Sequence, residues 1–538
     1  MYPPPRTPGV TCVLIAFQQT PPTRLQRANL LYRGVFEMLL RSAETRPGMS
    51  VMIVPNYPAA SASAAYAVGL REATQSMSHA ATQQLARGEG NVRISRRTLT
   101  DQWLAFFTLV LAGYAIGSKG FAYLGVSPLY IGEFSLGFGL LAFWHTHSIR
   151  RLLALPMIRI LLAFMAFGAI RTIPFLQVYG IEALRDGVLW GYGLFAIIIA
   201  GAVVSKPDRI RFLIDRYRRF LPVFLVAAPA VWLGTVLLER LARWVGVGIP
   251  MWPGTAVPIL NAKAGDLLVH LGGAAAFMAV GLAGKTSKSR ITLLVLGVAL
   301  TALSRGGLLA FSIAFAVAFA SRPRSRSAWS VALFFAGAIT LLAVSALHVR
   351  FPGNDRDISF EQLADRVAST AGSNRDVDLE NTKAWRLAWW AKIVSYTILG
   401  EYRWGGKGYG VNLATDDGFQ GTEDDSLRSP HNATMTVLAR SGVTGLLLWL
   451  SLLGAWGVRV IRAILDARGR GERHWYALFT FLLAYWLALL VNGSFDVYLE
   501  GPAGGIWFWS ILGFGIAAEA VYRAGVRVGG QPLPVLTA

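Results

Sequence analysis

Long apolar segments separated by shorter polar connections recur along this chain from Trp103 onward. The hydrocarbon core of a bilayer is about 30 Å thick, so an α-helix needs about 20 mostly apolar residues to cross it. Segments that approach this length lie near 103–118, 128–146, 153–170, 184–204, 219–238, 266–284, 290–304, 306–320, 328–347, 436–458, 475–491 and 501–522. The pattern predicts an all-α polytopic membrane protein with about twelve transmembrane helices.

The connections between these segments alternate between two kinds. One kind is strongly basic and contains Arg93, Arg96 and Arg97, Arg150 and Arg151, Lys206 through Arg219, Lys285, Lys288 and Arg290, Arg322, Arg324 and Arg326, Arg459 through Arg473, and Arg523 and Arg527. Because cytoplasmic connections carry the excess of Lys and Arg, this pattern predicts that these segments and both termini are cytoplasmic. The other connections, near 119–127, 171–183, 239–265, 348–435 and 492–500 together with a tight turn at 304–306, then face the opposite side.

The chain divides accordingly into five parts. Residues 1–100 are rich in Pro, Ala, Ser and Gln and hold no span-length apolar run, which indicates a poorly ordered cytoplasmic extension. An over-long gene start, with Met52 or Met77 as the true first residue, explains the same composition equally well. Transmembrane helices 1–9 are predicted in 101–347, a large outward loop in 348–435, helices 10–12 in 436–525 and a cytoplasmic tail in 526–538. A long ordered loop in a membrane protein with otherwise short connections is where function is expected.

Two helices are predicted inside the large loop. Ser359 followed by Gln362 is a capping-box pattern that opens a helix towards Ser369. A second helix, from about 379 to 399, carries Trp385, Trp389, Trp390 and Tyr396 among Lys383, Arg386 and Lys392. This mixture suits a helix at the membrane interface, although ordinary packing of the loop on the bundle fits it as well. The glycines at 405, 406, 408 and 410 then predict a flexible stretch without the spacing of a phosphate-binding loop.

Composition narrows the class further. Hydrophobic residues make up 54% of the chain and charged residues only 15%, which is too few charges for one large soluble core. The formal net charge is +21, but the basic residues are scattered between spans and do not form one module, which argues against nucleic acid as a partner. Cys12 is the only cysteine, so a disulfide within the chain and a cysteine-based metal site are excluded.

Three features on the outward side are candidates for chemistry. They are the turn Ser304-Arg305-Gly306-Gly307, the pair Arg171 and Arg185 with Asp186, and Pro430-His431-Asn432 at the start of the span that closes the large loop. A charged side chain at bilayer depth is costly, which makes Arg305 a functional candidate. Each has a plain structural alternative: Arg305 reaching the outer headgroups, Arg185 pairing with Asp186, and His431 capping a helix. Their common side of the membrane favours convergence into one site.

These motifs resemble those of a known superfamily. The segment Ser429-Pro-His-Asn-Ala-Thr-Met-Thr-Val-Leu-Ala-Arg-Ser-Gly-Val-Thr-Gly-Leu is similar to a hallmark of the O-antigen ligase and O-antigen polymerase superfamily, and the Ser-Arg-Gly turn at 304–306 matches the other hallmark. The stretch from Lys119 to Glu133 resembles the opening spans of many members. The resemblance covers roughly residues 100 to 525.

The resemblance implies a GT-C-like glycosyltransferase of the bacterial inner membrane, with a large helical periplasmic loop and an active site facing the periplasm. Its partners would be an undecaprenyl-pyrophosphate-linked glycan as donor and an acceptor hydroxyl within the membrane lipids. The acceptor is lipid A–core in the ligases of lipopolysaccharide biosynthesis and a second lipid-linked glycan in the polymerases of O-antigen or exopolysaccharide. Neither a metal ion nor a cofactor is expected.

Within this resemblance the candidate residues take definite roles. Arg305, with Arg171 or Arg185, would hold the pyrophosphate, because guanidinium groups bind phosphate oxygens in pairs and stay charged. His431 would accept the proton of the acceptor hydroxyl, since a helix N-terminus disfavours the charged imidazolium. Asn432 would orient the histidine or cap the helix. A single displacement would invert the anomeric centre.

Other interpretations remain open from the sequence. The acidic residues Asp416, Asp417, Glu423, Asp424 and Asp425 could bind a divalent cation, but their spacing matches no EF-hand and a solvated loop explains them better. A transporter is a second class of function, although no internal repeat is found and acidic residues at mid-span are scarce. A purely structural assembly protein is a third. Ligase and polymerase share the same motifs, and we place the ligase first.

Overall fold

The computed structural model describes residues 98–302, 304–321, 377–421 and 426–526. Residues 1–97, the apolar segment at 328–347, the helix that begins at Ser359 and the acidic residues Glu423, Asp424 and Asp425 lie outside the described residues. The described ranges belong to one compact unit, Arg96–Ala538.

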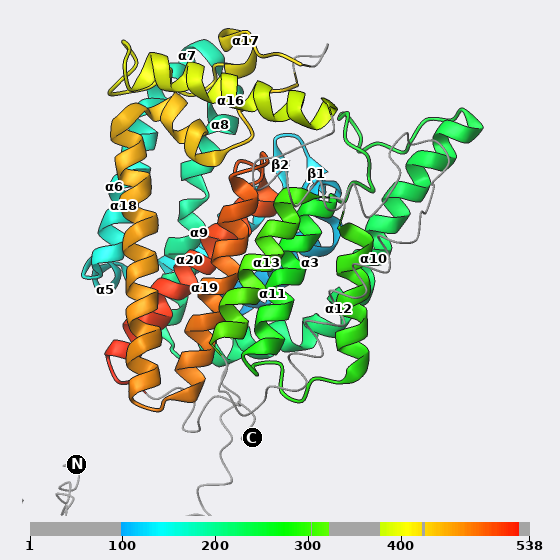
Figure 1. Cartoon of the computed structure of the whole chain (residues 1–538). Coiled ribbons are helices and arrows are strands. Elements are labelled where there is room, and N and C mark those ends of the chain that lie inside the picture. The colour runs from blue at the N-terminus through cyan, green and yellow to red at the C-terminus, as the bar shows by residue number, and fades with distance from the viewer. Residues whose placement is uncertain (1–97, 303, 322–376, 422–425, 527–538) are drawn as a thin grey trace, which may run out of the picture. The chain divides into compact units, whose positions relative to one another are not determined.

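The described residues form helices and one very small hairpin (Figure 1). The elements are α3 (Leu99–Ala122), β1 (Gly125–Val126), β2 (Leu129–Tyr130), α4 (Ile131–Trp144), α5 (Ile149–Leu153), α6 (Pro156–Thr172), η1 (Ile173–Phe175), α7 (Leu176–Tyr179), α8 (Ile181–Gly191), α9 (Gly193–Ser205), α10 (Arg209–Val245), α11 (Ala264–Ala279), α12 (Lys288–Thr301), α13 (Arg305–Ala320), α16 (Val377–Thr397), α17 (Leu413–Asp417), α18 (Ala433–Gly469), α19 (Arg473–Gly493) and α20 (Pro502–Arg523). β1 and β2 pair antiparallel.

Each apolar segment predicted within the described residues is a helix, but not every one of these helices is long enough to count as a span by itself. Among the described residues, six helices are long and apolar enough to cross a bilayer, and the bent pair α8 and α9 makes a seventh if it is one span. The apolar helices α4, α11 and α13 have only 14, 16 and 16 residues. At 1.5 Å per residue, 16 residues reach about 24 Å, which is less than the hydrocarbon core. The fold is that of an all-α membrane protein, while twelve spans are not confirmed.

Helix ends follow the capping chemistry of the sequence. Thr98 and Asp101 form a capping box at the start of α3, and Ser304 accepts a hydrogen bond from the backbone N–H of Gly307 at the start of α13. Pro156 and Pro502 occupy the first turn of α6 and α20. Backbone N–H groups in the first turn have no partner within the helix, so proline loses no hydrogen bond there. These signals fix where the apolar segments enter and leave the bundle.

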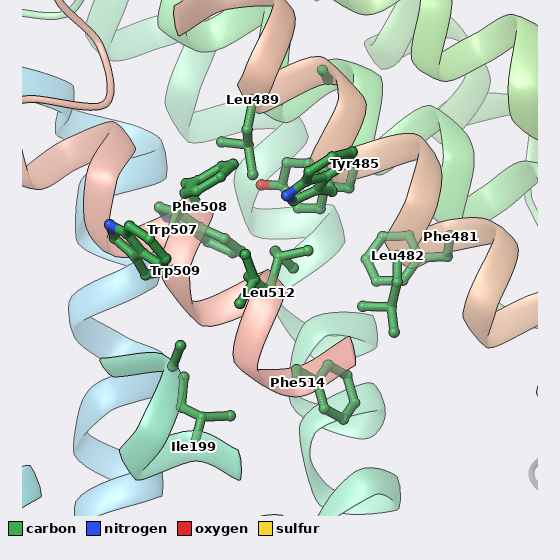
Figure 2. Packing of buried hydrophobic residues seen from close by; sticks show 14 of the residues in the cluster. Ile199, Phe481, Leu482, Tyr485, Leu489, Trp507, Phe508, Trp509, Leu512 and Phe514 are labelled. Atoms are coloured by element: carbon green, nitrogen blue, oxygen red, sulfur yellow. The ribbon is translucent and has the colours of Figure 1, made fainter. Parts of the chain in front are cut away.

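Helix α20 is the most enclosed of the long helices, with almost all of its residues buried between α3, α9, α18 and α19. Figure 2 shows its aromatic side chains among those of α19. The indole N–H of Trp507 donates to Leu111 in α3, at 2.9 Å, and that of Trp509 donates to Leu189 in α8, at 3.2 Å. Buried indoles need such acceptors, and these bonds tie α20 to helices distant in sequence.

Helices α9 and α20 approach each other very closely at a glycine of α20 that packs against the backbone of α9. Gly513 of α20 lies against α9, so that a Cβ atom at this position would collide with the carbonyl oxygen of Ala196. Small residues at such contacts let membrane helices pack backbone to backbone. By contrast, Gly454 of α18 is exposed and has open space where a Cβ atom would lie.

Helix α16 runs across the ends of more upright helices such as α18 and α6 (Figure 1). The side on which α16, α17 and the β1–β2 hairpin lie is called the α16 end below. The connection between α18 and α19 lies at the opposite end of the bundle, which we call the basic end because it carries Arg468, Arg470 and Arg473.

The substitution Gly513→Ala is expected to lower the apparent thermal unfolding temperature of the protein in detergent. Overpacking of this kind costs about 1–3 kcal/mol. Gly454→Ala is the matched control, since alanine is about 1 kcal/mol better than glycine in a helix and nothing obstructs its methyl group. Equal effects of the two substitutions in a thermal melt would contradict the close contact between α9 and α20.

Candidate functional site

His431 lies immediately before α18 in an unusual backbone conformation. Its φ is +54°, in the left-handed region that few residues other than glycine adopt. The preceding residue is held by α16, because the indole N–H of Trp390 donates to the carbonyl oxygen of Pro430 at 2.9 Å. The Trp385 ring packs edge-on at 6.4 Å from the imidazole. The imidazole is thus fixed between α16 and the start of α18.

Asn432 is the N-cap of α18. Its side-chain oxygen accepts from the backbone N–H groups of Thr434 and Met435, at 2.9 and 3.1 Å. Of the two roles considered for Asn432, capping is therefore the one that its contacts show. The cap also fixes the first turn of α18, directly after His431.

Asp496, in the connection between α19 and α20, faces the histidine. Its Oδ1 lies 3.5 Å from His431 Nδ1, which is a charge contact rather than a well-formed hydrogen bond. Its Oδ2 accepts from Lys263 Nζ at 3.2 Å, just before α11 begins. Three segments that are far apart in the sequence meet at this carboxylate.

The ionisation of Asp496 and Lys263 follows from this contact. Burial alone would raise the pKa of the Asp496 carboxyl, but the contact with His431 and the charge of Lys263 outweigh burial and hold the pKa well below its usual range. Burial alone would lower the pKa of Lys263, but the carboxylates of Asp496 and Asp266 raise it instead. Both groups are charged at neutral pH.

Two more cations lie close to Asp496. Lys119, at the end of α3, interacts electrostatically with Lys263, Arg185 and Asp496. Neither Lys119 nor Arg386 forms an ion pair with any residue that the structure describes. The three cations Lys119, Lys263 and Arg386 therefore outnumber the two carboxylates, Asp496 and Asp266, that act on them.

Arg386 of α16 reaches the same connection. Its Nη1 donates to the carbonyl oxygen of Phe495 at 2.9 Å, while its Nε is buried without a hydrogen-bond partner among the described residues. Burial lowers the pKa of this guanidinium, and the nearby Asp496 carboxylate counteracts the shift. A buried guanidinium N–H without an acceptor is costly and is suited to binding an anion.

Arg305 begins α13 at the same end of the bundle. The neighbouring Gly306 packs on the 495–496 connection, where a Cβ atom would lie 2.9 Å from Phe495 Cβ. Gly307 packs on the start of α11, where a Cβ atom would lie 2.8 Å from Gly265 Cα. Arg305 and His431, predicted to share a site, therefore both adjoin the short connection that contains Asp496.

We call Lys119, Lys263, Arg386, His431 and Asp496 the Asp496 cluster. Arg185 lies at the margin of this cluster, because its charge acts on Lys119. The side chain of Arg185 is 58% exposed, and its Nη1 lies 3.2 Å from Glu182 Oε2. The structural alternative in which Arg185 pairs with Asp186 does not occur. The cluster presents several cations, one carboxylate and one imidazole at the α16 end.

Arg171 has a different environment. Its Nε donates to the carbonyl oxygen of Gly405 at 2.8 Å and its Nη2 to that of Gly406 at 3.2 Å. The glycine stretch at 405–410, predicted to be flexible, is thereby fixed to the end of α6. This arginine shapes the loop rather than extending towards the Asp496 cluster.

The same glycine stretch inserts at a break in α18. Gly442 has φ +64°, and a Cβ atom there would lie 2.5 Å from the carbonyl oxygen of Arg403. The break frees backbone carbonyls, so that Lys407 N–H donates to Ala439 at 2.8 Å and Gly408 N–H to Arg440 at 3.0 Å. Only glycine allows this close approach of the two backbones.

A buried ion pair holds these pieces together. Arg440 is 1% exposed, and its Nη1 lies 2.9 Å from Asp186 Oδ2. The same carboxylate contacts Arg428 Nη2 at 3.0 Å and accepts from Gly410 N–H at 2.9 Å. Asp186 of α8 thus joins the glycine stretch, the segment before His431 and α18.

Part of the acidic stretch has structural partners. Asp416 and Asp417 both pair with Lys407, and Asp417 also accepts from the indole N–H of Trp389 at 2.8 Å. Asp417 is buried, so a fully solvated loop does not describe it. Across the described ranges, no three His, Cys, Asp or Glu side chains are gathered as metal ligands would be.

The contacts of α16 distinguish the two interpretations of its aromatic residues. Trp389 is fully buried and stacks on Phe419 at 5.6 Å, and Trp390 contacts Pro430. These contacts indicate that α16 packs on the rest of the loop and on the start of α18.

Lys263 and Asp496 were not among the sequence-based candidates. Both lie in connections that the charge pattern assigns to the outward side, at 239–265 and 492–500. Their predicted location on the same side of the membrane as His431 is a signal by which the sequence could have identified them as candidates. Lys119 and Arg386 did lie within stretches already noted, but only the fold brings all four together.

The substitution Arg440→Gln is expected to destabilise the protein strongly. Removing one partner of a buried ion pair costs about 3–5 kcal/mol because it leaves the other charge buried. The apparent thermal unfolding temperature in detergent should fall, and backbone amides at 405–411 should exchange hydrogen faster.

Arg185→Gln serves as the matched control, since an exposed pair contributes about 0–1 kcal/mol. If Arg440→Gln melted like Arg185→Gln with unchanged exchange at 405–411, the ion pair would not be what fixes the glycine stretch.

Comparison with known proteins agrees with the motifs. A family model described as O-antigen ligase matches residues 291–450, which include Arg305, Arg386, His431 and Arg440. Among curated proteins no match was found. Lys119, Lys263 and Asp496 lie outside the matched range. The resemblance noted from the hallmarks at Arg305 and His431 is therefore confirmed as a match to the O-antigen ligase family model over residues 291–450.

Proposed function

We propose that this protein is a glycosyltransferase that moves a glycan from undecaprenyl pyrophosphate to an acceptor hydroxyl. The observation that carries the proposal is the Asp496 cluster, in which cations from three distant segments and the imidazole of His431 lie near the same carboxylate at the α16 end. A diphosphate leaving group needs fixed positive charge, and an attacking hydroxyl needs a base. The cluster contains both kinds of group.

The imidazole of His431 is placed to accept a proton. With the Asp496 carboxylate beside Nδ1, the tautomer that carries its hydrogen on Nδ1 is favoured, and Nε2 keeps its lone pair. The carboxylate also stabilises the imidazolium formed when Nε2 takes the acceptor's proton. The left-handed backbone of His431 is the kind of local strain that accompanies functional residues.

The cations are assigned to the leaving group. Arg386 has a buried N–H without a partner in the described structure, and Lys119 has no ion pair there. We place both, with Arg305 and Arg185, around the pyrophosphate. Arg171 keeps a positioning role through the carbonyl oxygens of Gly405 and Gly406.

The reaction balances without a further reactant. The acceptor oxygen forms a bond to the anomeric carbon while the bond from that carbon to the phosphate oxygen breaks. The departing undecaprenyl pyrophosphate takes the electron pair, and His431 takes the proton. One displacement inverts the anomeric centre, and the fixed cations supply the charge stabilisation that a metal ion gives elsewhere.

The acceptor proposed first is lipid A–core, as in an O-antigen ligase of lipopolysaccharide assembly. The alternative is a second lipid-linked glycan, as in a repeat-unit polymerase, because the family covers both reactions. In either case the α16 end faces the periplasm from the inner membrane, with the basic end in the cytoplasm.

The test is transfer by the purified protein in detergent, with an undecaprenyl-pyrophosphate-linked glycan and each acceptor supplied in turn. We expect transfer in the presence of EDTA, with inversion at the anomeric carbon. His431→Ala should slow transfer about 10²–10⁴-fold and Arg386→Ala about 10²–10³-fold, as expected for loss of a base and of a charge-stabilising donor.

Two controls match these substitutions in chemistry. Lys392→Ala removes an exposed cation from the same helix as Arg386, and His474→Ala removes an imidazole from the start of α19. Both should retain transfer. Undiminished transfer by His431→Ala would refute the proposed base, and uptake of glycan into proteoliposomes without any transfer would favour a transporter.

A further inference from the structure

A second feature lies away from the Asp496 cluster, between α3 and α10. It is an apolar cavity of about 410 Å³, bounded also by α9, α11, α19 and α20. This volume falls within the range of roughly 300–1,000 Å³ that is usual for small-molecule sites. No member of the Asp496 cluster lines the cavity. It is a separate site, and the inference drawn from it does not depend on the proposed function.

The cavity opens towards the side of the bundle. Leu109 of α3 and Val223 of α10 line it and are 64% and 57% exposed. Deeper lining residues such as Phe107 and Phe481 are almost fully buried. In a membrane protein an apolar opening on the flank of the bundle faces lipid chains, not water.

Two arginines of α10 also line the cavity. They are Arg216 and Arg219, in the second and third turns after α10 begins at the basic end. The nearest acidic side chain on that helix, Asp215, already contacts Arg211 at 3.9 Å and Arg218 at 3.2 Å. Within the described part of the chain, neither Arg216 nor Arg219 has an ion-pair partner.

The cavity therefore combines an apolar interior with uncompensated positive charge at one end. We propose that it binds an anionic glycerophospholipid of the membrane. An acyl chain lies in the cavity between α3 and α10, and the headgroup phosphate contacts Arg216 and Arg219. A neutral chain alone would leave both guanidinium groups beside apolar surface without an anion, whereas a phosphate satisfies them through paired hydrogen bonds.

The position of the arginines fixes the orientation of the lipid. Its phosphate lies near the basic end and its chains extend towards the middle of the bundle, as for a lipid of the leaflet on that side. Basic pockets between membrane helices bind anionic headgroups in this way. The α16 end, where the Asp496 cluster lies, is not reached.

The experiment is native mass spectrometry of the full-length protein, delipidated in detergent and then incubated with phosphatidylglycerol or phosphatidylethanolamine. We expect one phosphatidylglycerol per chain to remain bound at collision energies that remove phosphatidylethanolamine. The double substitution Arg216→Gln with Arg219→Gln should lower this occupancy at least about fivefold. Ala112→Phe, which fills the cavity wall while keeping both arginines, should lower it similarly.

Arg150→Gln with Arg151→Gln is the matched control, because it removes two exposed arginines of α5 that do not line the cavity. It should retain the lipid. Equal occupancy in all variants, or equal retention of the two lipids, would overturn the proposal. Loss with the arginine variant but not with Ala112→Phe would also overturn it, since the lipid would then be held at the surface only. Thermal melts of each variant establish that the protein remains folded.

Discussion

The contact between Arg440 and Asp186 is a largely buried ion pair, with the two side chains 1% and 8% exposed, and the rest of the α16 end is arranged around it. Helix α18 breaks at Gly442, which leaves carbonyl groups that a continuous helix would have bonded. The glycine stretch at 405–410 supplies the missing donors, and the same carboxylate of Asp186 binds its backbone at Gly410. A buried guanidinium is tolerated only because a carboxylate and backbone carbonyls surround it. His431 lies about three turns before the break, so this arrangement also bears on its position.

The periodicity of apolar residues was sufficient to predict the helices. A helix in lipid forms all its backbone hydrogen bonds within itself, so that only its length and its apolar side chains have to be recognised in the sequence. It was not sufficient to count spans, because α4, α11 and α13 are shorter than the hydrocarbon core and their crossing depends on neighbours. Caps such as Asn432 were readable because they act within three residues. Ion-pair partners across the bundle could not be predicted, because the sequence around a carboxylate does not indicate which arginine it will contact.

The roles of the arginines illustrate this limit. Arg171, Arg185, Arg428 and Arg440 lie at the same end of the bundle, and the sequence gives no reason to distinguish them. In the fold, Arg440 and Arg428 share Asp186, Arg171 binds glycine carbonyls, and Arg185 stays exposed beside Glu182. Asp496 was not predicted as a site residue because nothing in the sequence distinguishes a single acidic residue in a short connection from other surface carboxylates. Its significance arises only when Lys263 and His431 meet it.

The side chains of the Asp496 cluster are held by contacts with neighbouring helices and loops, and this support matters for the proposed role of their charges. Fixed charges stabilise a developing anion best when they need not move as the reaction proceeds. Arg386 is held by the carbonyl oxygen of Phe495, His431 by the cap of α18 and the indoles of α16, and Asp496 by Lys263. These supports come from the bundle and the loop together. Gathering like charges in this way costs free energy during folding, where the packing of α11, α16 and α18 can offset it, and it leaves Lys119 and Arg386 without an ion pair among the described residues.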